Sequence, residues 1–318
     1  MSYFKPEPGE VWKCRNFPYN DMQNMGGERP CLIVGTKGSK YHCMMITSYN
    51  DGDYTGLSDV DIKKLKKKQG PEKQWKYDVK LPRYYINTEP YCSFVRVSII
   101  RTLSRGDLVK RLKVLDSQKY DDVMDMLDIA EAEYLDSPLN FMYWLIRHDI
   151  QYAEVKENYG RQSLPVKSVS EIQKTNAADC IDIALAVADI CKEENLQYML
   201  GYLLYKTKRE KKPKLHLFVM FKENSKVKSM HLAYNGFAYM FGEYDNYKYQ
   251  HYGEAIGDIC REFISREKGR FDQIQLYSIL DKETQDKITR DMDKNDIVRL
   301  ITNDDYGKYT IDAQIRQF

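Results

Sequence analysis

The chain has 318 residues, of which 42% are hydrophobic, and its 49 Lys and Arg nearly balance its 47 Asp and Glu. This length favours two domains, and the aromatic content of 13% argues against intrinsic disorder. Because the net charge is only +2, any contact with nucleic acid must come from a local basic patch. The seven cysteines have no paired spacing, and no apolar run approaches the roughly 18–20 residues that span a bilayer. We therefore expect a reduced, cytoplasmic protein that does not contact a membrane.

The first part of the chain predicts short strands followed by one helix. The expected strands are Glu10–Phe17, Cys31–Gly35, Tyr41–Ser48, Lys80–Asn87 and Phe94–Leu103, and the expected helix is Asp116–Leu135. Asp116 or Ser117 is suited to cap that helix, and Asp136-Ser137-Pro138 should end it. We expect domains at residues 1–136 and 137–290, with a C-terminal extension at 291–318.

Two polar residues stand at the ends of successive predicted strands. Pro30 suits the first position of a strand, which places Arg29 at the entrance of one strand and Thr47 at the exit of the next. In an antiparallel hairpin these two ends are neighbours, so a fixed cation and a hydroxyl would converge. Such a pair suits an anion, and a phosphodiester fits it.

Further short motifs surround this pair in a definite order along the chain: Pro8–Trp12, Phe17-Pro18, Arg29-Pro30, Ile46–Ser48 and Val95–Leu103, followed by the helix near Asp116–Leu135. In this order they resemble the MazF/PemK family of toxin endoribonucleases. The resemblance implies a small SH3-like β-barrel with a C-terminal helix, cleavage of single-stranded RNA, a homodimer and an antitoxin partner. It also implies catalytic roles for Arg29 and Thr47. We consider Glu28 as a general base or as an ion-pair partner of Arg29.

A lysine-rich segment follows the strand that carries Thr47. Cations interleaved with aromatic residues can follow a phosphate backbone and stack on bases, so this segment is either an RNA-binding surface or a solvated face. The candidate RNA-binding residues are Lys63, Lys64, Lys66, Lys67, Lys68 and Trp75.

The second part of the chain predicts helices around an antiparallel sheet. The expected helices are Leu139–His148, one beginning near Thr175–Asp179 and running to Glu194, Gly253–Glu267 and Asp281–Asp293. The expected strands are Gln197–Tyr205, Leu215–Phe221, Val227–Tyr234 and Phe237–Glu243. The predicted fold class of the whole chain is α+β.

Cys180 opens a predicted helix, and His216 lies on a strand two elements later. A helix N-terminus favours a thiolate, and a cysteine facing a histidine resembles the arrangement in papain-like and transglutaminase-like enzymes. That family implies a third polar residue, for which the chain offers His231 or Asn235. Without this pairing, Cys180 would be a small buried helix residue and His216 an exposed strand residue.

No metal-ligand spacing and no nucleotide-binding glycine motif occurs in the sequence, so we expect no cofactor and no metal. The preferred hypothesis is a metal-independent endoribonuclease of the toxin type, fused to a cysteine-hydrolase-like domain. The first alternative is a thiol hydrolase or transglutaminase-like enzyme that uses Cys180 and His216, with the barrel as a binding module. The second is a non-catalytic RNA- or protein-binding protein.

Overall fold

The protein is described by a computed structural model in which the chain divides into two compact units, Met1–Tyr134 and Leu135–Phe318. The residues described are 5–15, 28–67, 76–86, 89–153, 164–207, 214–232, 238–241, 249–266 and 271–303. Among them, no helix has the length and apolar character needed to cross a membrane.

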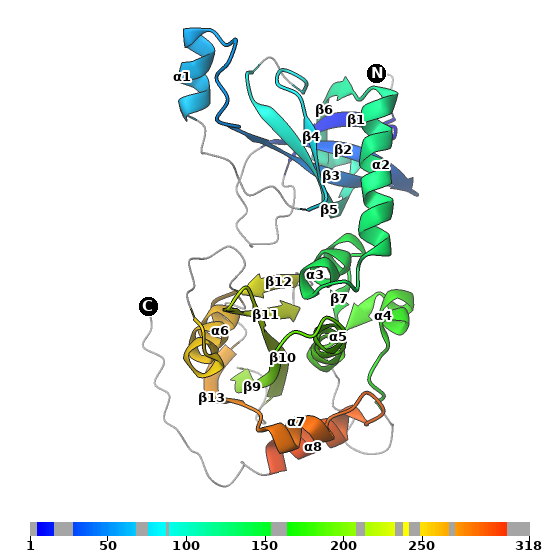
Figure 1. The fold of residues 1–318 in the computed structure, drawn as a ribbon. Coiled ribbons are helices and arrows are strands. Elements are labelled where there is room, and N and C mark those ends of the chain that lie inside the picture. Colours follow the sequence, from blue (N-terminus) through cyan, green and yellow to red (C-terminus); the bar gives the residue numbers. More distant parts are fainter. Residues whose placement is uncertain are drawn as a thin grey trace. The chain divides into compact units, whose positions relative to one another are not determined.

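The N-terminal unit is built on a six-stranded antiparallel sheet with the order β4-β5-β3-β2-β1-β6 (Figure 1). Its strands are β1 (Glu10–Cys14), β2 (Arg29–Lys37), β3 (Lys40–Tyr49), β4 (Asp78–Leu81), β5 (Cys92–Ser104) and β6 (Leu108–Val114). Its helices are α1 (Asp59–Lys67) and α2 (Ser117–Ala132), with a short 3-10 turn at Arg105–Asp107.

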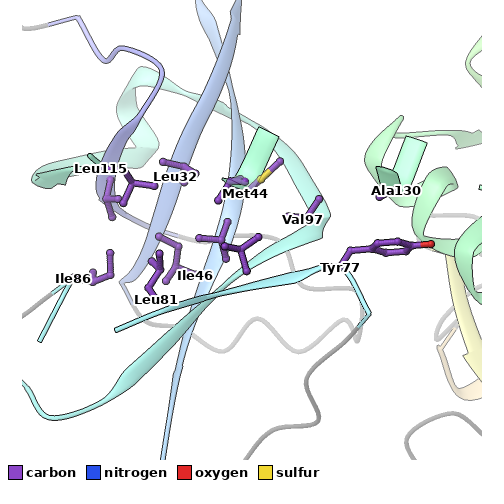
Figure 2. Packing of buried hydrophobic residues seen from close by; sticks show 13 residues of the cluster. Leu32, Met44, Ile46, Tyr77, Leu81, Ile86, Val97, Leu115 and Ala130 are labelled. Carbon is purple, nitrogen blue, oxygen red and sulfur yellow. The ribbon is translucent and has the colours of Figure 1, made fainter. Parts of the chain in front are cut away.

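This sheet buries apolar side chains on both faces. Alternate residues of the central strands project to opposite sides, so one core contains Leu32, Met44 and Ile46, packed together with Val123 and Ala130 of α2. Figure 2 shows this core, with Tyr77 pointing toward Ala130. The other face carries a second cluster, formed by the intervening positions: Trp12, Cys14, Cys31, Ile33, Tyr41, Cys43, Met45, Ile99, Leu103 and Leu108.

The strand pairing departs from the expected closed SH3-like barrel. Among the described residues, β4 pairs only with β5 and β6 only with β1, so the sheet stays open at both edges. The strand β6 was not expected from the sequence. Its pattern is obscured because, after Leu108, most of its side chains are exposed, as suits an edge strand rich in lysine and arginine.

The C-terminal unit combines helices with a five-stranded antiparallel sheet of order β12-β11-β10-β9-β13. The strands are β9 (Tyr198–Thr207), β10 (Lys214–Glu223), β11 (Lys226–Leu232), β12 (Ala238–Phe241) and β13 (Phe271–Ile279), with a separate parallel pair, β7 (Gln151–Tyr152) and β8 (Ala177–Ala178). The helices are α3 (Pro138–Arg147), α4 (Val169–Thr175), α5 (Cys180–Glu193), α6 (Tyr252–Arg266), α7 (Lys282–Lys287) and α8 (Lys294–Asn303).

Two helices cover opposite faces of this sheet, α5 on one side and α6 on the other (Figure 1). Phe218 and Met220 of β10 pack with Ile259 and Phe263 of α6. Helix α5 contacts β9, β10 and β11 from the other side, and eleven of its fourteen residues are buried. The small side chains at many α5 positions allow this close packing.

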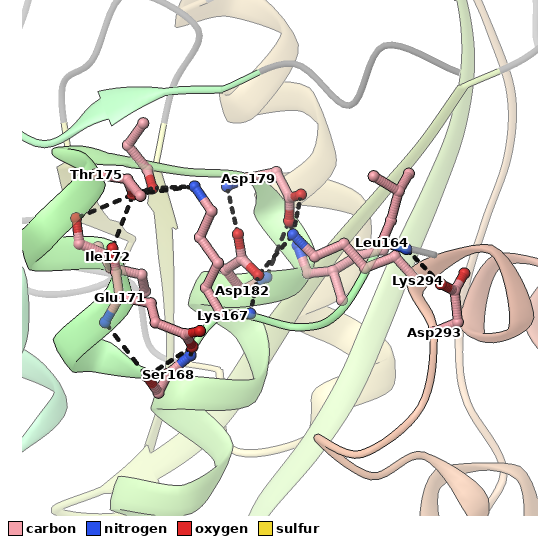
Figure 3. A network of polar contacts seen from close by, with 12 residues as sticks. Leu164, Lys167, Ser168, Glu171, Ile172, Thr175, Asp179, Asp182, Asp293 and Lys294 are labelled. Carbon is pink, nitrogen blue, oxygen red and sulfur yellow. Dashed lines mark hydrogen bonds and ion pairs between the residues drawn. The ribbon is translucent and has the colours of Figure 1, made fainter. Parts of the chain in front are cut away.

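The end of the chain differs from the expectation. The predicted helix Asp281–Asp293 is only α7, and the residues after it, which the sequence left unassigned, begin α8 at Lys294. The Lys294 ammonium is buried and contacts Asp179 Oδ2 at 2.6 Å and Asp182 Oδ1 at 2.7 Å (Figure 3). Asp179 is also the N-cap of α5, since its side chain accepts hydrogen bonds from the Ile181 and Asp182 amides. This network ties α8 to the start of α5.

Candidate functional site

Arg29 and Thr47 lie on neighbouring strands of the N-terminal sheet. Arg29 begins β2, where it pairs with Cys14 of β1, and Thr47 lies near the end of β3. Cys31 of β2 stands opposite Met45 of β3, and carrying that register two residues further places Arg29 opposite Thr47. Opposite residues of an antiparallel pair project from the same face, with Cβ atoms about 4.5–5.5 Å apart. The register therefore supports convergence of the guanidinium and the hydroxyl on one face.

The Thr47 side chain is buried, with an exposed fraction of 4%. Its Oγ1 atom has no hydrogen-bond partner within the described parts of the chain. An unpaired buried hydroxyl costs roughly 1–3 kcal/mol, so packing alone does not explain a threonine at this position. The same burial means that a phosphate contacts this hydroxyl only after the site opens.

Aromatic rings and a buried ion pair surround Thr47. Phe94 stands opposite Thr47 on β5, and its ring stacks on Tyr49 with centroids 4.1 Å apart. The Arg96 guanidinium lies 5.8 Å from the Phe94 ring centroid and binds Asp78 at 2.6 Å. Both charged side chains are buried, which lowers the dielectric around the site and strengthens its electrostatic interactions. Sequence analysis missed this pair because its only signal is the register that sets Asp78 opposite Arg96.

Glu28 forms ion pairs away from Thr47. Its carboxylate binds Lys13 Nζ at 2.5 Å and lies 3.8 Å from Arg15 Nε. The hydrogen bond from Lys13 lowers the pKa of Glu28, with smaller contributions from both cations. A carboxylate with a lowered pKa is a weaker proton acceptor, so the geometry favours the ion-pair role over the general-base role. The ion-pair partners of Glu28 are Lys13 and Arg15, whereas the sequence analysis considered Arg29 as the partner.

The candidate RNA-binding lysines lie on α1 as far as the structure describes them. Lys64 binds Glu89 at 3.1 Å and so faces the body of the unit. The other three described lysines of this helix are exposed: Lys63, Lys66 and Lys67. Lys68 and Trp75 lie outside the described residues.

The structure does not bring Cys180 and His216 together. Cys180 belongs to α5 and its thiol donates to the Leu215 carbonyl, at 3.7 Å. The His216 ring projects from the opposite face of the sheet, where it stacks on Phe263 of α6 with centroids 3.9 Å apart. The expected cysteine–histidine pair is therefore wrong, because consecutive positions of one strand face opposite sides of a sheet.

The chemistry of Cys180 also differs from the expectation. Burial raises the pKa of the Cys180 thiol to about 12, aided by the nearby Asp179 charge. This opposes the effect expected from the helix N-terminus, because desolvation disfavours a thiolate more than the helix dipole stabilises it. Asn235, the candidate third residue, lies outside the described residues.

His216 instead begins a buried chain of hydrogen bonds. Ser229 Oγ donates to the Val219 carbonyl at 2.8 Å and must accept from His231 Nε2 at 2.9 Å. His216 Nε2 and His231 Nδ1 share a hydrogen bond of 3.1 Å, and the tautomers of the two rings set which nitrogen donates. Full burial lowers the pKa of His216 to about 3, so the His216 ring is neutral near pH 7. The exposed position foreseen for an unpaired His216 is also wrong, because the residue is 2% exposed.

No group of three or more His, Cys, Asp or Glu side chains in the described parts of the chain is arranged to hold a metal ion. Arg29 and Thr47 offer a fixed cation and a hydroxyl beside aromatic rings. These groups can bind a phosphodiester and neutralise charge on its oxygens.

Residues 7–130 match the family model described as PemK-like, MazF-like toxin of type II toxin-antitoxin system. Among solved structures, the chain is similar to MazF from Deinococcus radiodurans, with 15% identity, 41% of this chain and 98% of that chain covered, and a TM-score of 0.28. It is also similar to an endoribonuclease from a mycobacterial species in complex with its cognate antitoxin, with 16% identity, 40% and 96% covered, and a TM-score of 0.27. The Mycobacterium tuberculosis toxin MazF-mt6 shares 12% identity over 39% of this chain and 96% of that chain, with a TM-score of 0.24.

No curated protein matches the chain. The match of the family model to residues 7–130 supports the PemK/MazF resemblance that the sequence motifs indicated. None of these comparisons supports a transglutaminase-like fold for the second unit.

Proposed function

We propose that the protein is a metal-independent endoribonuclease that cleaves single-stranded RNA and that Arg29 and Thr47 are its catalytic residues. The observation that carries this proposal is the register of β2 and β3, which brings Arg29 opposite Thr47 when it is extended two residues beyond the Cys31–Met45 pair. The PemK/MazF-like family of residues 7–130 supports the same activity, because this family consists of toxins of toxin-antitoxin systems.

In this proposal the substrate supplies its own nucleophile. The ribose 2′-hydroxyl attacks the adjacent phosphorus, the bond from phosphorus to the 5′-oxygen breaks, and a proton moves from the 2′-oxygen to the leaving oxygen. The products are a 2′,3′-cyclic phosphate and a 5′-hydroxyl. Arg29 stabilises the charge that builds on the phosphoryl oxygens, since its guanidinium can donate two parallel hydrogen bonds. Thr47 donates to the same phosphoryl group.

The burial of Thr47 adds a conformational requirement to this mechanism. RNA must displace the atoms that cover the hydroxyl before the phosphate contacts it, and the new hydrogen bond then offsets the cost of leaving Oγ1 unpaired. Glu28 serves in this scheme as the partner of Lys13 and Arg15 at the edge of the site.

The partners follow from the family and are part of the proposal. A protein antitoxin that blocks the RNA site is expected for a toxin of this class. A homodimer stays a prediction from the sequence resemblance.

The decisive experiment is incubation of the purified protein with a mixed RNA in the presence of EDTA, followed by mapping of the cut ends. We expect Arg29→Ala to reduce cleavage about 100- to 1,000-fold, the usual loss when one donor to a developing oxyanion is removed. The circular dichroism spectrum should not change, because Arg29 lies at the end of its strand. Full cleavage by Arg29→Ala would refute the assignment, and wild-type binding without cutting would favour a non-catalytic RNA-binding protein.

A further inference from the structure

Helix α1 docks one face on the unit and exposes the other, its free face, where the Lys66 ammonium lies 5.7 Å from the centroid of the Tyr54 ring. Asp61, Lys64 and Leu65 share the docked face, and Leu65 is fully buried. The exposed lysines share the free face, at positions i, i+3 and i+4 of the helix: Lys63, Lys66 and Lys67. Asp59 is the only acidic residue of α1 that is fully exposed beside them, so the free face is positively charged.

Specific contacts hold the docked face in place. The Asn50 side-chain amide donates to the Leu65 carbonyl at 3.1 Å and accepts from the Gly52 amide at 2.9 Å. The Tyr84 hydroxyl donates to Asp61 Oδ2 at 3.1 Å. Asn50 is 7% exposed, so its hydrogen bonds form away from competing water. The helix is thus fixed to the unit at its first and last turns.

These contacts place α1 at the end of the sheet that carries the candidate site. Asn50 directly follows β3, three residues after Thr47, which is about 10 Å of extended chain. Lys40, at the other end of β3, is about 23 Å from Thr47 by the same measure. The nine residues of α1 extend over about 13 Å.

We propose that Asn50 is a positioning residue that holds the free face of α1 as a binding surface for the single-stranded RNA flanking the phosphodiester at Arg29 and Thr47. This inference rests on the proposed nuclease function and adds to it a path for the strand. The three exposed lysines contact phosphates beyond the cut, so α1 contributes to the affinity for longer strands. Helix α1 does not change the affinity for an RNA that is short enough to contact only Arg29 and Thr47.

Salt dependence provides the first test. Each phosphate neutralised on a single strand adds about 0.7 to the slope of log affinity against log salt. Binding is measured with RNA carrying 2′-O-methyl groups, which lacks the nucleophile and stays intact. The variant Lys63→Gln/Lys66→Gln/Lys67→Gln should lower the magnitude of the slope by about 2. The matched control Lys5→Gln/Lys40→Gln/Lys110→Gln removes the same charge from exposed positions elsewhere in the unit and should leave the slope near that of the wild type. Equal effects of the two triple variants would overturn the inference.

The second test separates position from charge. Asn50→Ala keeps every lysine but releases the last turn of α1. We expect it to weaken binding of a long methylated RNA several-fold, with a smaller salt slope, and to leave binding of a dinucleotide unchanged. Unchanged binding of the long strand, in a variant that melts as the wild type does, would refute the positioning role. If Asn50→Ala does not fold, the lysine variants still test whether the free face of α1 binds RNA, because they change only exposed side chains.

The two proposals fail in different ways. If the nuclease proposal is wrong, unmodified RNA stays intact with the wild type. If only the α1 inference is wrong, the wild type cuts RNA and the two triple variants bind alike.

Discussion

Each unit of the molecule buries a polar atom that has no hydrogen-bond partner within the described residues. Two such atoms, among several, are Thr47 Oγ1 in the first unit and His216 Nδ1 in the second. Thr47 lies near the end of β3, opposite Phe94 of β5 and near the Arg96–Asp78 ion pair, and Arg29 comes opposite it when the β2–β3 register is extended by two residues. His216 is enclosed by aromatic rings in the layer between its sheet and α6.

This comparison shows that an unpaired buried atom does not by itself identify a functional site. The surroundings of Thr47 supply cations for an anionic ligand, whereas the rings of described residues that stack on His216 are those of Phe218, His231 and Phe263. The second unit also satisfies its buried charges internally, through Lys294, Asp179 and Asp182. We therefore place the proposed catalytic site in the first unit and propose a structural role for the buried polar groups of the second.

The largest expected effect is a loss of stability of the second unit when the ion pairs of Lys294 are removed. Lys294→Met leaves two buried carboxylates without their cation and should reduce the free energy of unfolding of the second unit by about 3–5 kcal/mol. Arg299→Met on the same helix is the control, because its ion pair with Asp296 is exposed and contributes about 0–1 kcal/mol. Chemical denaturation, monitored through the hydrogen exchange of α5 amides, measures the free energy of unfolding of the second unit in both variants. Equal losses would show that the buried network is not what stabilises this unit.

A second expected effect is the loss of stability in acid caused by His216. Because burial lowers the pKa of His216 to about 3 from an ordinary value near 6.5, only the unfolded state takes up the proton between these values. The stabilisation is complete above about pH 6.5 and falls by about 1.4 kcal/mol for each pH unit below it. His216→Phe, which keeps the stack on Phe263, should flatten that slope, while His251→Gln at an exposed position should not. An unaltered slope in His216→Phe would show that other groups cause the acid sensitivity.

Thr47 should show opposite effects on stability and on cleavage. Thr47→Val replaces an unpaired buried hydroxyl by a methyl group of similar size, so we expect the free energy of unfolding to rise by about 1 kcal/mol. RNA cleavage should fall at least tenfold in the same variant, because the phosphate loses a donor. Thermal melts and cleavage rates of the same preparations test this. If Thr47→Val retained full cleavage, Thr47 would have only a packing role, and the proposed difference in function between Thr47 and His216 would be weakened.

The smallest expected effect concerns the thiols of the second unit. Burial raises the pKa of both Cys180 and Cys191 to about 12, so native protein should react with iodoacetamide equally slowly at the two sites. Mass spectrometry of the labelled peptides measures the ratio directly. Selective labelling of Cys180 would restore the thiol-enzyme hypothesis for this unit.

Several elements follow from the sequence because their signals are local. Asp116 caps α2, as predicted, by accepting a hydrogen bond from the Lys119 amide at 2.8 Å, and the helix expected to run to Glu194 is present as α5. The resemblance to the PemK/MazF family was also visible in short motifs, and the family model matches residues 7–130.

The arrangement of partners was decided only by the tertiary structure. Cys180 and His216 face opposite sides of a sheet, Asp78 meets Arg96 across two strands, and Lys294 reaches Asp179 over 115 residues of chain. Caps and hydrophobic periodicity depend on neighbouring residues, so they can be read along the chain. The face on which a side chain lies, and the charge it meets there, depend on the register between distant segments, and a shift of one residue would reverse the face.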